Sequence, residues 1–279
     1  MIVTTTGLRI NLRDRGREGS LGDRAAFCHV FIADEYDFLL SRISAGDVVI
    51  DAGANIGCFA LRAALRVGPR GVVIAVEPEP SNVACLKGNI QLNAMSNVIV
   101  VERALDGVHD KTVHVIGTGT TARVEETGTV IDVYDRTAGI SRTAVRTTTL
   151  DEVIKDLSIE RLDAIKMDIE GAENSVFSTA STSSALGIAT TVAVEVHDRD
   201  GPRVVQSRLR AEGYSYVGQV KPQSKFLTNS IRRGARRPDL MLMLYGMDIV
   251  PVAARMLAAA LNQRPDPDSD ILGIVYAAR

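Results

Sequence analysis

The chain has 279 residues, of which 46% are hydrophobic and 24% are charged, and its formal net charge is -2. These values are typical of a globular protein with one large domain, or with a domain and a small cap. A charge this close to zero gives no overall field toward nucleic acid or a membrane. Three scattered cysteines exclude a disulfide framework or a zinc site. No apolar run suits a transmembrane helix and no signal peptide is visible, so we expect a cytoplasmic enzyme.

The first 44 residues form an expected lead-in or cap. They predict a short strand at 7–12, a charged loop at 13–24 and a helix at 34–43 that Asp34 caps. From Val48 onward, apolar runs alternate with amphipathic segments. The expected strands lie at 48–52, 71–77 and 98–103, and the expected helices at 55–66 and 80–93. This alternation predicts half of a doubly wound parallel sheet.

A stretch at 106–148 interrupts the alternation. It is rich in Thr, Val and Gly, with short alternating runs at 112–116 and 129–134, which predicts a β-hairpin insertion that caps the sheet. Thr149 and Glu152 then have the spacing of a capping box at the start of a helix. The remaining expected elements are strands at 162–168, 188–196, 214–219 and 240–245, and helices at 171–177, 202–212 and 252–261.

Together these elements predict an α/β fold with a Rossmann-like, doubly wound sheet of seven strands, the last of them antiparallel at 240–245. We expect a lead-in at 1–44, a main domain at 45–250 that contains the insertion, and a C-terminal helix and tail at 251–279.

The turn after the first core strand indicates the ligand. A dinucleotide fold has glycine at the middle position of Gly-x-Gly-x-x-Gly, but here Asn55 stands between Gly53 and Gly57. The Asn55 side chain would crowd a pyrophosphate. Glu77 ends the second strand, where a carboxylate accepts hydrogen bonds from ribose hydroxyls. A ribose without a pyrophosphate fits S-adenosylmethionine.

Four motifs carry a family resemblance. They are Asp51-Ala-Gly-Ala-Asn-Ile-Gly, Glu77-Pro, Thr149-Leu-Asp and Lys166-Met-Asp-Ile-Glu-Gly-Ala-Glu173. Over roughly residues 35–216 the chain resembles the FkbM family of S-adenosylmethionine-dependent methyltransferases. The resemblance implies a class I methyltransferase fold and O-methylation of a hydroxyl on a sugar, a polyketide or another small metabolite. It does not name the acceptor, and the segment beyond 216 matches no family pattern.

The expected cofactor site gathers at the glycine turn and the ends of the strands. Asp51 would order the turn or face the methionine ammonium, or it is a structural acid that caps the next turn. Ala104 and Leu105 follow the third strand, where this fold packs adenine, although plain core packing explains them equally well. The predicted cofactor-binding residues are Asp51, Gly53, Asn55, Gly57, Glu77, Pro78, Ala104, Leu105 and Asp168, and Glu79 or Asn82 would assist.

The predicted catalytic residues are Asp168, Glu195 and His197, at the ends of two adjacent strands. Glu195 and His197 are two apart, so both would face the pocket on one strand. A histidine can take a proton from an alcohol near neutral pH, which makes His197 the expected base. Mg²⁺ is an optional cofactor, held if present by Asp168, Glu195 and His197. Glu170 would contact substrate, or it is a first-turn acid favoured by the helix dipole.

The arginines at 232, 233, 236 and 237 form a basic cluster. They are surface charges, or Arg232 and Arg233 bind an anionic small-molecule acceptor. The same cluster raises RNA methylation as a second function, which the net charge and the absence of tryptophan disfavour, so no nucleic acid or membrane partner is expected. A third class of function is that of a nicotinamide oxidoreductase, which Asn55 disfavours, or of a non-catalytic nucleoside-binding module. The sequence does not indicate an oligomeric state.

Overall fold

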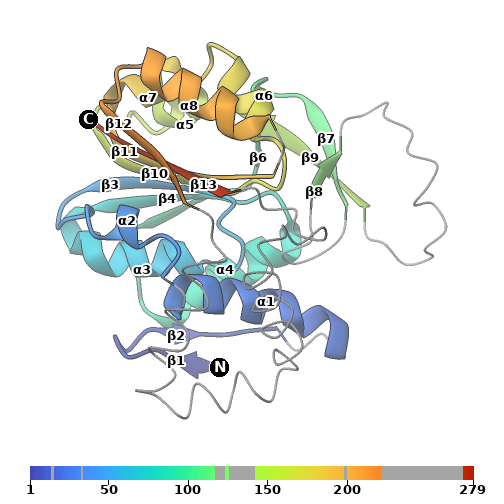
Figure 1. Ribbon diagram of the computed structural model, residues 1–279. Coiled ribbons are helices and arrows are strands. Elements are labelled where there is room, and N and C mark those ends of the chain that lie inside the picture. Colours follow the sequence, from blue (N-terminus) through green and yellow to red (C-terminus); the bar gives the residue numbers. More distant parts are fainter. Residues whose placement is uncertain (14–15, 33, 117–122, 126–141, 198–199, 221–272) are drawn as a thin grey trace, which may run out of the picture.

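The structure is a computed structural model, which describes residues 1–13, 16–32, 34–116, 123–125, 142–197, 200–220 and 273–279 (Figure 1). Its centre is a seven-stranded sheet with the order β12-β13-β11-β10-β3-β4-β5. The strands are β3 (Val48–Ala52), β4 (Val72–Val76), β5 (Val98–Val101), β10 (Leu162–Met167), β11 (Ala189–Val196), β12 (Tyr216–Val220) and β13 (Gly273–Ala278). All neighbours are parallel except β13, which is antiparallel to both β11 and β12. The predicted fold class is therefore confirmed.

Helices cover both faces of this sheet, as Figure 1 shows. On one face lie α1 (Gly16–Phe31), α2 (Asp37–Leu40), α3 (Cys58–Val67) and α4 (Pro80–Leu92), and on the other α5 (Leu150–Asp156), α6 (Glu173–Ser178), α7 (Ser183–Ile188) and α8 (Gly201–Ala211). Successive residues of a strand point to opposite faces of the sheet, so each strand contributes side chains to the apolar clusters on both faces. Val49 belongs to the apolar cluster under α3, while Ile50 belongs to the cluster under α5–α8.

The last strand of the sheet differs from the prediction. Residues 240–245 and 252–261 lie outside the described residues, and the antiparallel strand is β13, inside the expected C-terminal tail. The run Gly-Ile-Val-Tyr-Ala-Ala is short, and periodicity alone does not distinguish it from a tail. It becomes a strand because it hydrogen-bonds to β11 on one side and β12 on the other, which buries Ile274, Val275 and Tyr276.

The lead-in also differs from its prediction. The expected loop at 13–24 is largely helical, because α1 begins at Gly16 and packs on α3 through buried residues such as Phe27 and Val30. Asp34 does not cap the next helix. Its φ is +52°, its carboxylate binds Arg62 at 2.8 Å, and α2 begins after Tyr36. The expected strand at 7–12 shrinks to β2 (Arg9–Ile10), which pairs with β1 (Ile2–Val3).

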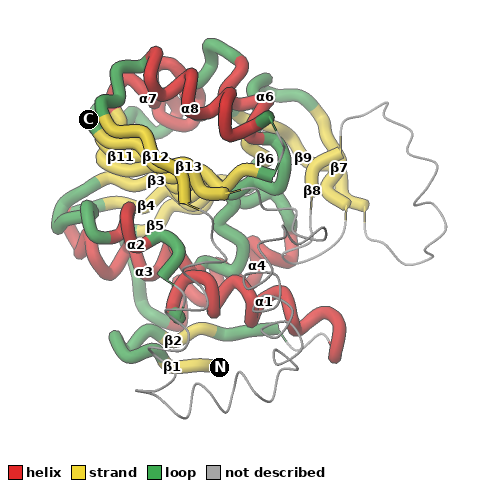
Figure 2. Tube along the Cα trace, in the orientation of Figure 1, coloured by secondary structure: helices red, strands yellow, loops and turns green. Residues whose placement is uncertain are grey.

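The insertion forms a small sheet of its own beside the main one (Figure 2). The strands β6 (Ala104–Leu105), β7 (Thr112–Ile116), β8 (Arg123–Glu125) and β9 (Arg142–Thr148) have the order β6-β9-β7-β8. The antiparallel pairing of β7 with β9 confirms a hairpin-like insertion, while the expected run at 129–134 lies outside the described residues. Directly after β9, the Thr149 hydroxyl accepts a hydrogen bond from the Glu152 backbone N–H at 3.2 Å, as expected of a helix cap.

Candidate active site

The turn after β3 requires glycine at two positions. Gly53 has a φ of +74°, and a Cβ there would lie 1.7 Å from the carbonyl oxygen of Asp168. Gly57 has a φ of +92°, and a Cβ would meet the Leu86 side chain at 2.6 Å. Asn55 between them also has a positive φ, +51°, which asparagine adopts more easily than most residues. The sequence pattern thus sets the shape of this turn by steric necessity.

Glu77 follows β4 and lies opposite that turn. Its carboxylate accepts hydrogen bonds from the backbone N–H of Asn55 at 2.7 Å, the backbone N–H of Glu79 at 3.0 Å and the amide of Asn82 at 3.0 Å. Burial raises the pKa of Glu77, which is 4% exposed, and these three donors oppose that rise by stabilising the charged form. The carboxylate is thus held in one orientation at the wall of a cavity.

This cavity has a volume of about 270 Å³ and extends from Glu77 to the ends of β10 and β11. The predicted residues that line it are Gly53, Asn55, Glu77, Pro78, Asn82, Ala104, Leu105, Asp168, Glu170 and Glu195. Asp51, Gly57, Glu79 and His197 are described but do not line it. The cavity combines an open turn, the oriented carboxylate of Glu77 and the apolar side chains of Ala104 and Leu105. These features fit an adenosine group with a free ribose diol.

Asp51 lies next to the cavity in a buried ion pair. It stands directly opposite Lys166 in the register of β3 and β10, and its Oδ1 lies 3.3 Å from the Lys166 Nζ. Burial opposes the charge on Lys166, but Asp51, Asp168 and Glu195 outweigh it, so the pKa of the ammonium is raised. Lys166 also donates to the carbonyl of Gly53 at 2.9 Å. Lys166 therefore links Asp51 to the glycine turn, an arrangement compatible with the first of the three roles considered for Asp51.

Tyr36 joins the acids at the other end of the cavity. Its hydroxyl donates to Glu195 Oε2 at 2.5 Å and lies 3.4 Å from Asp168 Oδ2. Burial raises the pKa of Glu195 to about 8, and the charges of Asp168 and Glu35 add to the rise. Sequence reasoning missed Tyr36 and Lys166 as site residues. A lysine within an apolar strand is a detectable signal, but nothing marks a tyrosine in a lead-in helix.

Helix α1 adds a cation to this end of the cavity. His29 lines the wall, and its Nδ1 lies 3.0 Å from Glu35 Oε2. Burial opposes protonation of the ring, but Glu35 and, more weakly, Glu195 and Asp168 raise its pKa to about 9. Sequence reasoning gave His29 no role, because its position relative to the strand ends depends on a helix that the sequence does not predict.

His197 does not sit as the sequence predicts. Strand β11 ends at Val196, so the two-residue alternation that would place His197 beside Glu195 has already stopped. The Nδ1 of His197 is 3.0 Å from Glu173 Oε1, and its Nε2 faces Glu170 at 3.6 Å. Burial opposes protonation, but Glu173 and Asp168 raise the pKa of His197 to about 10. A ring that is already protonated at neutral pH has no lone pair for a substrate proton, so this geometry argues against His197 as the base.

A cation site would use a different set of ligands from the predicted one. Among the described residues, ligand atoms of Asp168, Glu170 and His197 lie within 4.8 Å of one another. Glu195 is not in this group, and its carboxylate accepts a hydrogen bond from Tyr36. Glu170 lines the cavity with a φ of +54°, and burial followed by repulsion from Asp168 raises its pKa to about 7. The arginines at 232, 233, 236 and 237 lie outside the described residues.

The architecture and the cavity together define a class of protein. A parallel sheet with one antiparallel strand inserted near its edge, a glycine turn after the first core strand and a buried acid after the second are features of S-adenosylmethionine-dependent methyltransferases. A family model described as the Methyltransferase FkbM domain matches residues 51–216, more than half of the chain. The chain belongs to this family and is an S-adenosylmethionine-dependent methyltransferase.

Relatives of known activity include other methyltransferases. The 31-O-demethyl-FK506 methyltransferase FkbM of Streptomyces tacrolimicus is 29% identical over 202 residues, which cover 63% of this chain and 76% of that protein. The methyltransferase sdnD of Sordaria araneosa is 27% identical over 172 residues, 53% of this chain and 66% of that protein. The AMB antimetabolite synthetase AmbE of Pseudomonas aeruginosa is 29% identical over 199 residues, 55% of this chain but 8% of that protein.

Two solved structures show partial similarity to the chain. An S-adenosylmethionine-dependent O-methyltransferase from Thermotoga maritima has a TM-score of 0.42 at 14% identity, covering 67% of this chain and 52% of that one. Aeropyrum pernix fibrillarin with bound S-adenosylmethionine has a TM-score of 0.42 at 12% identity, covering 85% and 68%. Similarity at this level does not indicate a substrate. In the part of the chain that the structure describes, no helix is long and apolar enough to span a membrane.

Proposed function

We propose that this protein is an O-methyltransferase that acts on a hydroxyl of a small molecule, such as a sugar or another metabolite. The observation that carries the proposal is the buried carboxyl of Glu195, which lines the cavity beside Asp168 and has a pKa of about 8. A base with a pKa near the working pH is suited to taking a proton from an alcohol. The relative named 31-O-demethyl-FK506 methyltransferase, although only 29% identical, supports the same type of reaction.

The cofactor would occupy the Glu77 end of the cavity. The Glu77 carboxylate would accept hydrogen bonds from the two ribose hydroxyls, and Ala104 and Leu105 would pack on the adenine. Asp168 stands at the far side of the glycine turn, between this end and Glu195. When bound there, S-adenosylmethionine supplies a methyl group that is electrophilic because it is attached to a sulfonium.

Glu195 would act on the acceptor. Its carboxylate would take the proton of the acceptor hydroxyl as that oxygen bonds to the methyl carbon, and the electron pair of the broken carbon–sulfur bond would remain on sulfur. With a pKa of about 8, roughly a tenth of Glu195 is ionised at pH 7. Tyr36 holds the carboxylate in place through its hydroxyl, and the main contribution of the site is alignment of the reacting atoms in a partly enclosed space.

The acceptor end of the cavity suits a neutral, hydroxyl-rich molecule, because its charged groups already pair with one another. Asp168, Glu170 and Glu195 line it together with the cations Lys166 and His29, which pair with Asp51 and Glu35. The proposal of an anionic acceptor rests on Arg232 and Arg233, and so does RNA as a substrate; neither arginine is among the described residues.

A divalent cation at Asp168, Glu170 and His197 is a separate proposal for acceptor activation. The three ligand types suit a hard or borderline cation, and Glu173 would hold the opposite nitrogen of His197, as in many metal sites. Dialysis against a chelator followed by return of Mg²⁺ or Mn²⁺ tests it. Loss of methyl transfer and its recovery with the cation would support a cation site. Unchanged transfer would mean that Glu195 activates the acceptor hydroxyl without a cation.

The experiment that tests the proposed function follows a labelled methyl group. The protein is incubated with methyl-¹³C S-adenosylmethionine and a panel of sugars and polyketide alcohols, and products are analysed by NMR. We expect a new methyl carbon bonded to oxygen, formed by the wild type and strongly reduced for Glu195→Gln. A methyl carbon bonded to nitrogen or carbon would contradict O-methylation, and full activity of Glu195→Gln would contradict the role of Glu195.

A further inference from the structure

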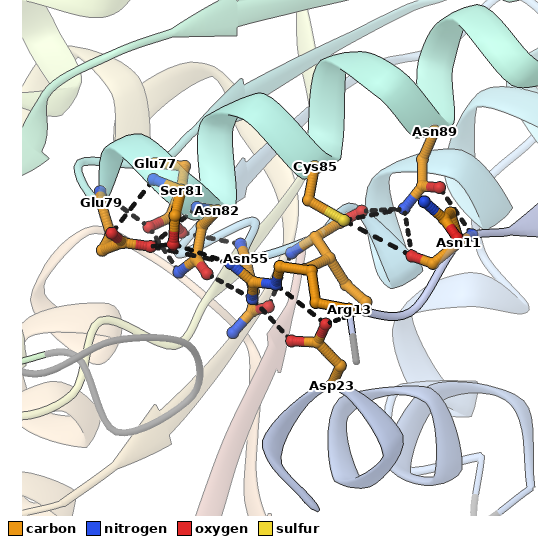
Figure 3. Close-up of polar contacts among 11 residues, drawn as sticks. Asn11, Arg13, Asp23, Asn55, Glu77, Glu79, Ser81, Asn82, Cys85 and Asn89 are labelled. Atoms are coloured by element: carbon orange, nitrogen blue, oxygen red, sulfur yellow. Dashed lines mark hydrogen bonds and ion pairs between the residues drawn. The ribbon is translucent and has the colours of Figure 1, made fainter. Parts of the chain in front are cut away.

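We propose that Arg13, from the N-terminal lead-in, is a positioning residue of the cofactor site: it fixes Asn82 so that Asn82 holds Glu77 in the orientation that binds ribose. The inference rests on the proposed role of Glu77. Figure 3 shows the guanidinium of Arg13 between Asp23 on one side and the start of α4 on the other.

Asp23, on α1, holds the guanidinium from one side. The Nε of Arg13 donates to Asp23 Oδ2 at 2.9 Å and Nη2 donates to Asp23 Oδ1 at 2.6 Å, a two-point pairing that fixes the plane of the group. The backbone N–H of Arg13 also donates to Asp23 Oδ2, at 2.8 Å. Asp23 is only 1% exposed, so solvent screening of this pair is weak.

The same guanidinium reaches three side chains at the start of α4, where its Nη1 also lies 3.8 Å from Glu79 Oε2. Nη1 donates to Ser81 Oγ at 2.9 Å and Nη2 donates to Asn82 Oδ1 at 2.7 Å. Arg13 is separated from Ser81 and Asn82 by 68 and 69 positions in the sequence. One side chain therefore connects the lead-in to the segment that follows Glu77.

The contact with Asn82 determines what Asn82 presents to Glu77. An asparagine amide has one accepting and one donating end, and its orientation is assigned from its partners. Arg13 can only donate, so it binds the oxygen of Asn82 and leaves the NH₂ to donate to Glu77 Oε1 at 3.0 Å. Without Arg13 the Asn82 oxygen loses its charged donor, so the amide is held less firmly with its NH₂ toward the carboxylate. Arg13 thus acts on Glu77 through Asn82.

The position of Asp23 extends this link to the cavity wall. Asp23 is followed on α1 by Ala25, Ala26 and His29, which line the cavity. Asp23 therefore fixes Arg13 against the helix that forms this wall, and Arg13 acts on the cofactor site through Asn82. A change at Arg13 should weaken cofactor binding even though Arg13 itself does not line the cavity.

The test is a double-mutant cycle on the affinity for S-adenosylhomocysteine, measured by calorimetry. We expect Arg13→Ala and Asn82→Ala each to weaken binding about tenfold or more, and the double variant to be no weaker than Asn82→Ala alone, since both act on one link. Arg208→Ala is the matched control. Arg208 is a comparably buried arginine that binds Glu212 and Ser183 at 2.8 and 2.7 Å, away from the cavity, so its loss should leave the affinity within twofold.

Two further variants keep the outcome decisive. Arg13→Lys keeps the positive charge and thus the pairing with Asp23, but a single ammonium cannot reproduce all the hydrogen bonds of the planar guanidinium. This variant should therefore still weaken binding, while its melting temperature stays close to that of the wild type. An affinity within twofold of wild type for both Arg13 variants would overturn the inference, as would effects that add in the double variant. Glu77→Gln distinguishes failure of the proposed ribose contact from failure of the inference about Arg13. If Glu77→Gln also leaves the affinity unchanged, the ribose contact is wrong. If only Glu77→Gln weakens binding, the inference about Arg13 fails and the ribose contact stands.

Discussion

The two ends of the cavity are built in different ways. The centre of the Glu77 end comes from residues 53–82, which belong to two adjacent strand–helix units. Glu77 accepts hydrogen bonds from the backbone N–H groups of Asn55 and Glu79 and from the side-chain amide of Asn82. The Glu195 end is assembled from segments far apart, such as Tyr36 and Glu195, which are 159 positions apart. We therefore propose that the sterically fixed Glu77 end holds the cofactor and that the Glu195 end holds the acceptor.

The largest expected effect comes from a substitution in the glycine turn at the Glu77 end of the cavity. Gly53→Ala would place a Cβ 1.7 Å from the Asp168 carbonyl in a left-handed conformation, so we expect it to lower the free energy of unfolding by at least ~4 kcal/mol and to abolish binding of S-adenosylhomocysteine. Gly46→Ala is the control: its φ is +90° but nothing lies within 4 Å, so only about 1 kcal/mol of backbone strain is expected. Urea denaturation of both variants measures the difference, and equal losses would contradict the steric account.

The next effect concerns the ion pair beneath the glycine turn. Lys166→Met leaves Asp51 buried without its cation, which we expect to cost about 3 kcal/mol of the free energy of unfolding. Lys155→Met removes an exposed lysine that pairs with Glu152, and should cost less than about 0.5 kcal/mol. Thermal or urea unfolding of both variants checks this. A small loss for Lys166→Met would mean that Asp51 is neutral in the folded protein.

How far the sequence predicts the site follows the same division. Strands β3, β4, β10 and β11, the glycine turn and Glu77 are predictable because steric and hydrophobic rules act locally there. Tyr36 and Arg13 are not predictable, since their partners are distant in sequence. Tyr36 lies in the expected capped helix and Arg13 in the expected loop, and both of these predictions are wrong or only partly right. His197 shows another limit: the strand ends at Val196, as predicted, so the alternation that places Glu195 does not extend to His197. Strand β13 shows that pairing on both sides can make a strand from a short run that looks like a tail.

The third prediction concerns the acceptor end and pH. Glu195 must be ionised to accept a proton, so kcat/KM with any acceptor that the methyl-transfer panel yields should rise about tenfold per pH unit below about 8 and level off above it. Glu195→Gln should lower kcat at least ~100-fold and remove that rise. A rate that does not change between pH 6 and 9 would remove Glu195 from the reaction.

His197→Gln is the companion to that experiment. Because the ring of His197 is protonated below its pKa of about 10, it should not produce the rise near pH 8, and the variant should keep the pH dependence of the wild type. Any loss should appear mainly in stability, because Glu173 loses its partner at 3.0 Å. Disappearance of the rise in His197→Gln would return the base to His197.

The smallest effect sharpens the role of Tyr36. Its hydroxyl stabilises the ionised form of Glu195, so Tyr36→Phe should raise the pKa of Glu195 further and move the rise in kcat/KM to higher pH, with a several-fold loss of rate at pH 7. Tyr214→Phe is the control, because that hydroxyl donates to the carbonyls of Leu186 and Ala189 and not to a cavity residue. The control should lose some stability and leave the pH profile unmoved.

One measurement tests the division of the cavity most directly and needs no acceptor. Glu77→Gln and Glu195→Gln make the same chemical change at two buried carboxyls, and calorimetric titration with S-adenosylhomocysteine compares them. The account predicts that Glu77→Gln weakens binding about tenfold or more, roughly 1.4 kcal/mol, while Glu195→Gln stays within twofold of the wild type. Equal weakening in both variants, or weakening in Glu195→Gln alone, would contradict the placement of the cofactor at the Glu77 end.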